Sequence, residues 1–138
     1  MLLAAPAIIL TAAVTILAAL VCLGTAILVS RTRSRHNVLP PAMSGAPEVE
    51  RALRVQGNTV EQMMIFLPLL WVAALYFHMI GWLVPALGLL WCIGRVVFAI
   101  GYMAEAKKRG PGFGISILSS LALAVLGVIG VIQAWTAS

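Results

Sequence analysis

The chain has 138 residues, of which 62% are hydrophobic and 9% are charged, and its mean hydropathy is +1.08. A soluble domain of this size does not need so much apolar surface, so the composition excludes an ordinary soluble protein and predicts one that lies in a bilayer. Aspartate is absent, and nine basic residues against four glutamates give a formal net charge of +5. The basic residues adjoin apolar runs, so they favour anionic headgroups or an anionic ligand over nucleic acid as a partner.

Four apolar runs predict four spanning helices, because a spanning helix needs about 20 apolar residues. In chain order they cover about residues 5–29, 58–77, 82–102 and 113–134. The first run has no basic segment before it and is too long for a signal peptide. Short segments with proline or glycine ("VLPPAMSGAPE", "HMIG" and "RGPGFG") separate the runs. We therefore expect an all-α integral membrane protein, an up-down antiparallel four-helix bundle that forms a single domain over residues 1–138.

The two cysteines, Cys22 and Cys92, fall inside apolar runs and are expected to be small buried hydrophobic residues. With two cysteines and no neighbouring ligands, the sequence predicts neither a disulfide framework nor a metal site. Any thiol chemistry would therefore use a thiol that arrives with a ligand.

The distribution of basic residues predicts the orientation. Eight of the nine lie in or beside the first and third connections: Arg31, Arg33, Arg35, Arg51, Arg54, Lys107, Lys108 and Arg109. By the positive-inside rule these connections are cytoplasmic and both termini lie on the outer side.

Polar residues form a stripe along the second span and another along the third. At about 100° per residue, four residues of the second span fall within an arc of about 80°. They are Arg51, Arg54, Asn58 and Glu61. On the third span a similar arc holds Arg95, Phe98 and Tyr102, and also Glu105 and Arg109 if the helix continues that far.

These stripes must face protein or water, because a central charge that faces lipid costs about 2.5–3.5 kcal/mol. One explanation is an internal ion pair between Glu61 and Arg95 that fixes the helix register. The other is a site for an anionic ligand that enters from the cytoplasmic side, since basic groups outnumber acidic ones along both stripes. The two explanations are compatible.

Two segments, "PPAMSGAPEVERALRVQGNTVEQMMIFLPLLWVAALYFH" and "GRVVFAIGYMAEAKKRG", resemble the MAPEG family of membrane-associated proteins in eicosanoid and glutathione metabolism. The resemblance covers about Val38 to Gly112 and is nearest to the subgroup of leukotriene synthases and microsomal glutathione transferases. Its most specific part is the pattern R-x-x-R-x-Q-x-N-x-x-E. It implies a homotrimer of four-helix subunits that binds glutathione between neighbouring subunits near the cytoplasmic side.

Carried over by position, the resemblance implies that Arg109 is the catalytic residue and stabilises the glutathione thiolate. It also implies that Arg54, Gln56, Asn58 and Glu61 bind glutathione, that Arg51 supports them, and that Tyr102 and Arg33 match further family positions. With Arg95 from the polar stripe, the predicted glutathione-binding set is Arg33, Arg51, Arg54, Gln56, Asn58, Glu61, Arg95 and Tyr102.

The chain departs from the family pattern in three places. Gln62 and Phe98 stand where the nearest relatives have tyrosines, and at Phe98 one hydroxyl contact is lost. The basic cluster "SRTRSRHN" does not align cleanly with the arginine pair of the family. These departures bear on the identity of the second substrate.

The sequence therefore predicts a glutathione S-transferase that joins the thiolate to lipophilic electrophiles, with a peroxidase activity toward lipid hydroperoxides as an extension. The electrophile would enter from the membrane between the first and fourth spans of adjacent subunits, where Gly24, Gly127 and Gly130 permit close helix contacts. Ordinary helix packing explains most of these glycines equally well.

Two other functions stay open. A non-catalytic member of the same fold would bind membrane lipids and present them to other proteins. A small four-span transporter would use Glu61 within the membrane.

Overall fold

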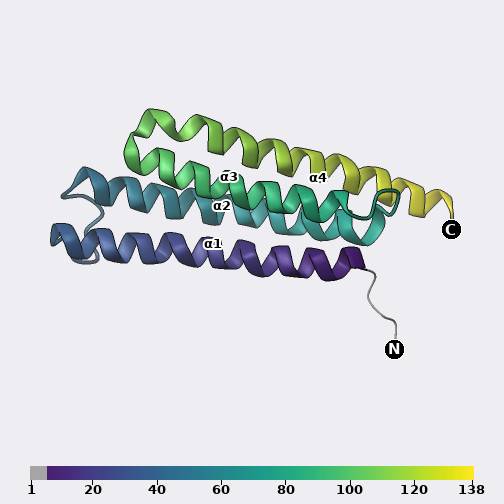
Figure 1. Cartoon of the computed structure of the whole chain (residues 1–138), viewed down its shortest axis with the longest axis horizontal. Coiled ribbons are helices and arrows are strands. Elements are labelled where there is room, and N and C mark those ends of the chain that lie inside the picture. The colour runs from purple at the N-terminus through teal and green to yellow at the C-terminus, as the bar shows by residue number, and fades with distance from the viewer. Residues whose placement is uncertain (1–5) are drawn as a thin grey trace.

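The computed structural model describes residues 6–138, and four long helices run along most of them (Figure 1). They are α1 (Pro6–His36), α2 (Pro47–Tyr76), α3 (Leu83–Ala104) and α4 (Gly110–Thr136), with a short 3-10 helix, η1 (Ala106–Arg109), between α3 and α4. All four long helices have the length and apolar composition needed to cross a membrane. The predicted all-α four-helix membrane bundle is therefore confirmed. Residue 5, where the first span was expected to begin, lies outside the described residues.

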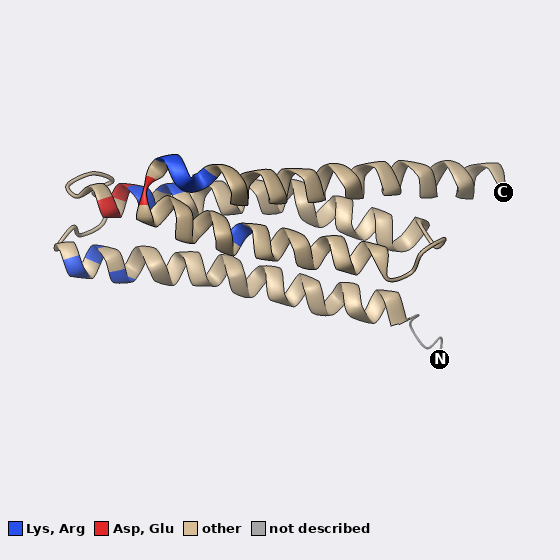
Figure 2. Cartoon of the chain, turned by 45° about the horizontal axis from the view of Figure 1, so that its top comes forward, with Lys and Arg blue, Asp and Glu red and all other residues tan. Residues whose placement is uncertain are grey.

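The helices alternate in direction, so the start of α1 and the end of α4 lie at the same end of the bundle (Figure 1). Charged residues gather at the opposite end, around the α1–α2 and α3–α4 connections (Figure 2). The exposed indoles of Trp82 and Trp135 belong to the α2–α3 connection and to the last turns of α4. The bundle thus has one charged end and one end with exposed tryptophans, a division typical of a helix bundle that crosses a bilayer.

At the charged end, the second and first helices extend furthest beyond the predicted spans. The second helix begins at Pro47 rather than near residue 58, with proline in its first turn and two glutamates beside it, a combination that favours a helix start. The first helix continues to His36, and basic residues in its last turn are favourable at a helix C-terminus. Asn37 then adopts φ 53°, and the N–H of Val38 donates to the carbonyl of Arg33 at 3.1 Å, which closes the helix.

The core contains buried residues from all four long helices. Phe66 and Trp91 are fully buried and stack with ring centroids 4.1 Å apart. Glycines bring α4 close to both neighbours, because a Cβ on Gly112 would collide with the backbone of Phe98, and one on Gly130 would lie 2.5 Å from the carbonyl carbon of Tyr76. The α4 backbone is therefore held tightly against α3 at the charged end and against α2 at the other end.

Among residues 6–138, two of the three glycines considered for contacts between subunits pack against another helix of the same chain and one does not. Gly127 approaches Val72 and Ala73 of α2 within the chain, as Gly130 approaches Tyr76, so both serve the packing of α4 on α2. A Cβ on Gly24 would meet no other atom within 4 Å among the described residues.

Candidate functional site

A cavity of about 350 Å³ lies at the charged end of the bundle. Its lining comes from four elements: Arg54 and Asn58 of α2, Phe98 and Tyr102 of α3, Arg109 of η1 and Phe113 of α4. Four of the residues predicted for the site, Arg54, Asn58, Tyr102 and Arg109, are thus brought together. Among residues 6–138, the polar part of the lining is two arginines, an asparagine and a tyrosine, with no aspartate or glutamate. The cavity is suited to an anionic ligand with several hydrogen-bonding groups.

Arg109 reaches the cavity by a route that the helical projection did not predict. The α3 helix ends at Ala104 and Glu105 is extended (φ −158°, ψ 132°), so Glu105 and Arg109 do not continue the α3 stripe. The chain then folds back in η1, whose backbone at Lys108 packs so closely on Gly101 that a Cβ there would collide with it. This return places the guanidinium carbon of Arg109 5.7 Å from the ring centroid of Tyr102, within reach of a cation–π contact.

Arg95 lies beside the cavity but does not line it. Its side chain is fully buried, and Nη2 donates to Oδ1 of Asn58 at 2.9 Å and to Oγ1 of Thr59 at 3.2 Å. Its guanidinium carbon lies 4.0 Å from the ring centroid of Phe98. Arg95 therefore contacts two residues that line the cavity, Asn58 and Phe98.

The expected ion pair between Glu61 and Arg95 is not formed, and that explanation of the stripes is wrong. Glu61 is exposed, and among residues 6–138 the ion pairs are His36–Glu48, Arg51–Glu48 and Lys108–Glu105. Arg95 donates instead to neutral oxygens of α2, those of Asn58 and Thr59, which come three and two residues before Glu61.

The other predicted site residues lie away from the cavity of this single chain. Arg51 pairs with Glu48 at 3.6 Å. Nη1 of Arg33 donates to the carbonyls of Val38 and Ala42 at 3.2 and 2.6 Å, so this side chain holds the α1–α2 connection. Gln56 is half-buried and Glu61 is exposed, and neither lines the cavity.

Sequence reasoning missed two residues at the site, Thr59 and Phe113. Thr59 is fully buried, and both Thr59 and Asn58 accept hydrogen bonds from Arg95. The available signal in the sequence was its position four residues after an apolar residue, Val55, and so on the same helical face. Phe113 lines the cavity from the first turns of α4, and as an apolar residue at the edge of an apolar run it gave no signal of a site. Gln62, which replaces a family tyrosine, is buried in the bundle and does not line the cavity.

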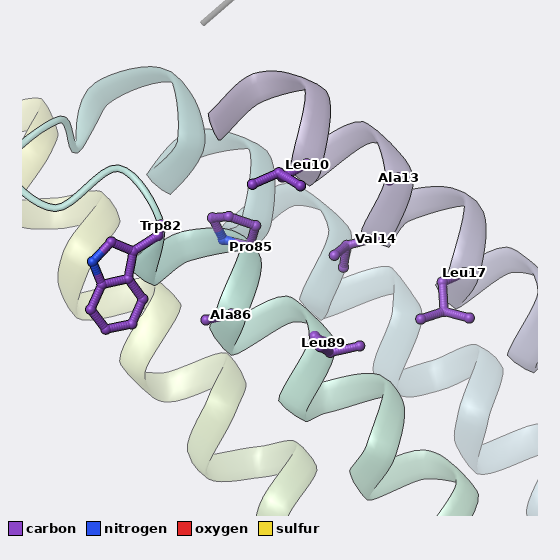
Figure 3. Close-up of a pocket in the computed structure, with 8 residues that line it drawn as sticks. All are labelled: Leu10, Ala13, Val14, Leu17, Trp82, Pro85, Ala86 and Leu89. Atoms are coloured by element: carbon purple, nitrogen blue, oxygen red, sulfur yellow. The ribbon is translucent and has the colours of Figure 1, made fainter. Parts of the chain in front are cut away.

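A second pocket, of about 430 Å³, lies between α1 and α3 near the opposite end of the bundle. Figure 3 shows Leu10, Val14 and Leu17 of α1 on one side and Pro85 and Leu89 of α3 on the other. The side chains that line it are apolar apart from the indole N–H of Trp82. The described residues place no charged group in it, and the cavity at the charged end, which two arginines line, is the candidate for binding a polar substrate.

Comparison with known proteins agrees with this geometry. The sequence profile of the MAPEG family matches residues 11–129. Human microsomal glutathione S-transferase 2 is 41% identical over 123 residues, which cover 89% of this chain and 82% of that protein. Leukotriene C4 synthase of Cavia porcellus is 37% identical over 123 residues, covering 87% of this chain and 81% of that protein. An uncharacterized protein of Synechocystis sp. is 40% identical over 121 residues, covering 88% and 87%.

The match extends over all four helices and includes every residue that lines the cavity. The chain is an integral, multi-pass membrane protein and belongs to the MAPEG family.

Proposed function

We propose that this protein is a membrane-embedded glutathione S-transferase that joins the glutathione thiolate to lipophilic electrophiles. The observation that carries the proposal is the cavity in which Arg54 and Arg109 meet Asn58 and Tyr102. Glutathione carries two carboxylates, one ammonium group and two amides, so an excess of guanidinium groups with neutral hydrogen-bonding partners matches its charge. The names of relatives 37–41% identical to this chain, a glutathione S-transferase and a leukotriene C4 synthase, support the same chemistry.

Arg109 would activate the thiol. A free thiol with a pKa of about 8.5 is mostly protonated at neutral pH, and the thiolate is the nucleophile. A guanidinium held near the sulfur favours the anion, and each unit by which the thiol pKa falls corresponds to about 1.36 kcal/mol. The thiol proton would go to water, and the thiolate would attack the electrophilic carbon to form a C–S bond. In an epoxide, for example, the C–O bond at that carbon would break, its electron pair would stay on the oxygen, and the resulting alkoxide would take a proton from water.

The same thiolate would support a peroxidase reaction. Two glutathione molecules would be oxidised to the disulfide while a lipid hydroperoxide is reduced to the alcohol, with release of one water molecule. The two electrons that glutathione gives up are those that the hydroperoxide takes, so the reaction needs no other oxidant or reductant.

The remaining predicted ligands would act in a homotrimer. Arg54 and Glu61 are exposed on α2, and a charge that faces hydrocarbon is costly, by up to about 2.5–3.5 kcal/mol at the bilayer centre. A neighbouring subunit that covers this face would enclose the cavity and bring Glu61 to its edge. Gln56, on another face of α2, and Arg33, beside the α1–α2 connection, would then reach glutathione across a subunit boundary, and Arg51 would support it from the helix start. Glutathione and the cavity would lie on the cytoplasmic side.

The test is a titration of the detergent-purified protein with glutathione, followed by the ultraviolet absorbance of the bound thiolate. We expect a saturable signal that Arg109→Ala abolishes at neutral pH, with kcat/KM lowered about tenfold for each unit by which the thiol pKa rises. Because Arg109 lowers that pKa, the pH at which activity reaches half its maximum should rise in the variant toward about 8.5. Native mass spectrometry of the same sample should give three chains of 14.6 kDa.

Lys107→Ala is the matched control, since Lys107 belongs to the same short helix and does not line the cavity. It should retain the thiolate signal. Equal loss of binding and turnover in Arg109→Ala would contradict the activating role of Arg109. No binding to the wild-type protein at millimolar glutathione would contradict the proposed function and favour the lipid-binding scaffold or the transporter that uses Glu61.

A further inference from the structure

Arg95 is a buried cation without an acidic partner among residues 6–138. Its relative exposure is 0%, and the nearest oxygens that accept from it belong to a neutral amide and a neutral hydroxyl. Its Nε and Nη1 have no protein partner in the part of the chain that the structure describes. A cation buried in a spanning helix is costly, and one held by neutral groups alone is a poor way to stabilise a bundle. Its contacts therefore point to a role other than stability.

Those contacts fix the orientation of the Asn58 amide. A guanidinium group can only donate hydrogen bonds, so an asparagine that bonds to it must present its oxygen. Oδ1 of Asn58 accepts from Nη2 of Arg95 at 2.9 Å. The Nδ2 group of Asn58 is thereby directed away from Arg95, and Asn58 lines the cavity. The side chain therefore offers two N–H donors to a carboxylate or carbonyl oxygen of a ligand.

Arg95 also supports the opposite wall of the cavity. Its guanidinium carbon lies 4.0 Å from the centroid of the Phe98 ring, and Phe98 lines the cavity from α3. One buried side chain thus contacts a polar wall residue on α2 and an aromatic wall residue on α3. Arg95 itself does not line the cavity.

We propose that Arg95 is a positioning residue that orients the Asn58 amide as a donor to glutathione and holds Phe98 in the wall, without touching the ligand. This inference rests on the proposed function. Its defining consequence is that Arg95 and Asn58 act on glutathione binding as a unit, so the loss of either removes the same ligand contact.

A double-mutant cycle measures this coupling. The glutathione Kd of Asn58→Ala, Arg95→Met and the double variant would be measured by calorimetry in detergent, with the melting temperature of each variant. We expect each single variant to raise Kd about tenfold, because one hydrogen bond to a charged group is lost. The double variant should also show about a tenfold increase, because the two effects are not independent. The thiolate absorbance per bound glutathione should stay unchanged, since Arg109 is intact in all three.

Thr59→Val is the matched control. Thr59 is the other acceptor for Arg95 and does not line the cavity, so its loss should change the melting temperature but leave Kd within about twofold. Arg95→Lys keeps one charged donor, so its glutathione Kd should lie between those of the wild-type protein and Arg95→Met. If Arg95→Met does not fold, Arg95→Lys replaces it in the double-mutant cycle.

The outcomes separate the two proposals. A wild-type protein that binds no glutathione overturns the proposed function and this inference with it. If the wild-type protein binds glutathione, two results overturn the inference alone. One is an Arg95 variant that binds glutathione as well as the wild-type protein does, and the other is a double variant whose Kd rises about a hundredfold.

Discussion

Tyr102 has two separable chemical parts at the cavity. Its ring is the surface over which the Arg109 guanidinium lies, and it also meets the Phe98 ring with centroids 5.5 Å apart. Its hydroxyl can donate a hydrogen bond to a ligand. Substitutions that keep or remove the ring therefore distinguish the placement of Arg109 from direct binding.

Tyr102→Phe should raise the glutathione Kd without changing the bound thiolate signal, because the ring beneath Arg109 remains. Tyr102→Leu should also reduce the thiolate signal and lower kcat about two- to fivefold, the equivalent of a cation–π contact worth about 0.5–1 kcal/mol. The measurements are the thiolate titration and steady-state kinetics on both variants. Equal kcat in the two would show that the ring does not place Arg109.

Residue offsets predicted part of this site and could not predict the rest. Arg54 and Asn58 are four positions apart and share a helical face, so their common location followed from helical geometry. The partner of Arg95 could not be predicted in this way, because a helical projection gives the direction of a side chain but neither its depth in the bundle nor its rotamer. Glu61 is only one turn beyond Asn58, yet it is exposed while Asn58 meets Arg95.

At the scale of the elements, the position of α4 on α3 sets the width of the cavity. Gly112 packs against the backbone of Phe98, and Phe113, its neighbour, lines the cavity. The end of α3 was the least predictable boundary, because no proline or glycine marks Glu105, where the helix stops. The return of η1 onto Gly101 depends on a tertiary contact that local sequence does not encode.

Gly112→Ala should destabilise the bundle and weaken glutathione binding, because the new Cβ must push α4 away from Phe98. Overpacking of this kind costs about 1–3 kcal/mol, which lowers the melting temperature by roughly 2–4 °C per kcal/mol. Thermal unfolding in detergent and the glutathione titration measure the two effects.

Gly114→Ala is the control for that substitution, since a Cβ there meets nothing within 4 Å in the described part of the chain. It should leave the melting temperature unchanged or slightly higher, because alanine favours a helix over glycine. A Gly112→Ala variant as stable as Gly114→Ala would show that α4 does not need the close approach.

Across the whole molecule, charge is concentrated at the end that carries the cavity (Figure 2). The alternation of four spans with short connections was readable from hydropathy because each run is long and bounded by proline or glycine. The assignment of the charged end to the cytoplasm rests on the positive-inside rule and stays a prediction.

Cysteine labelling tests this orientation. In a Cys22→Ala, Cys92→Ala background, a membrane-impermeant maleimide added to intact cells should label Ser138→Cys and leave Ser44→Cys unlabelled until the cells are permeabilised. Both serines are exposed, one at the C-terminus and one in the α1–α2 connection. The opposite labelling pattern would invert the assigned topology.

The length of α2 has a kinetic consequence. Its 30 residues span about 45 Å, whereas the hydrocarbon layer is about 30 Å thick. In a helix centred on that layer, Arg54 and Asn58, about 10–17 Å from the helix start, would lie close to the boundary between headgroups and hydrocarbon. At that depth the two substrates would arrive from different phases. Turnover would then follow the molarity of the thiol in water but the mole fraction of the electrophile among lipids. Adding inert lipid at a fixed total amount of electrophile should therefore slow the enzyme by surface dilution.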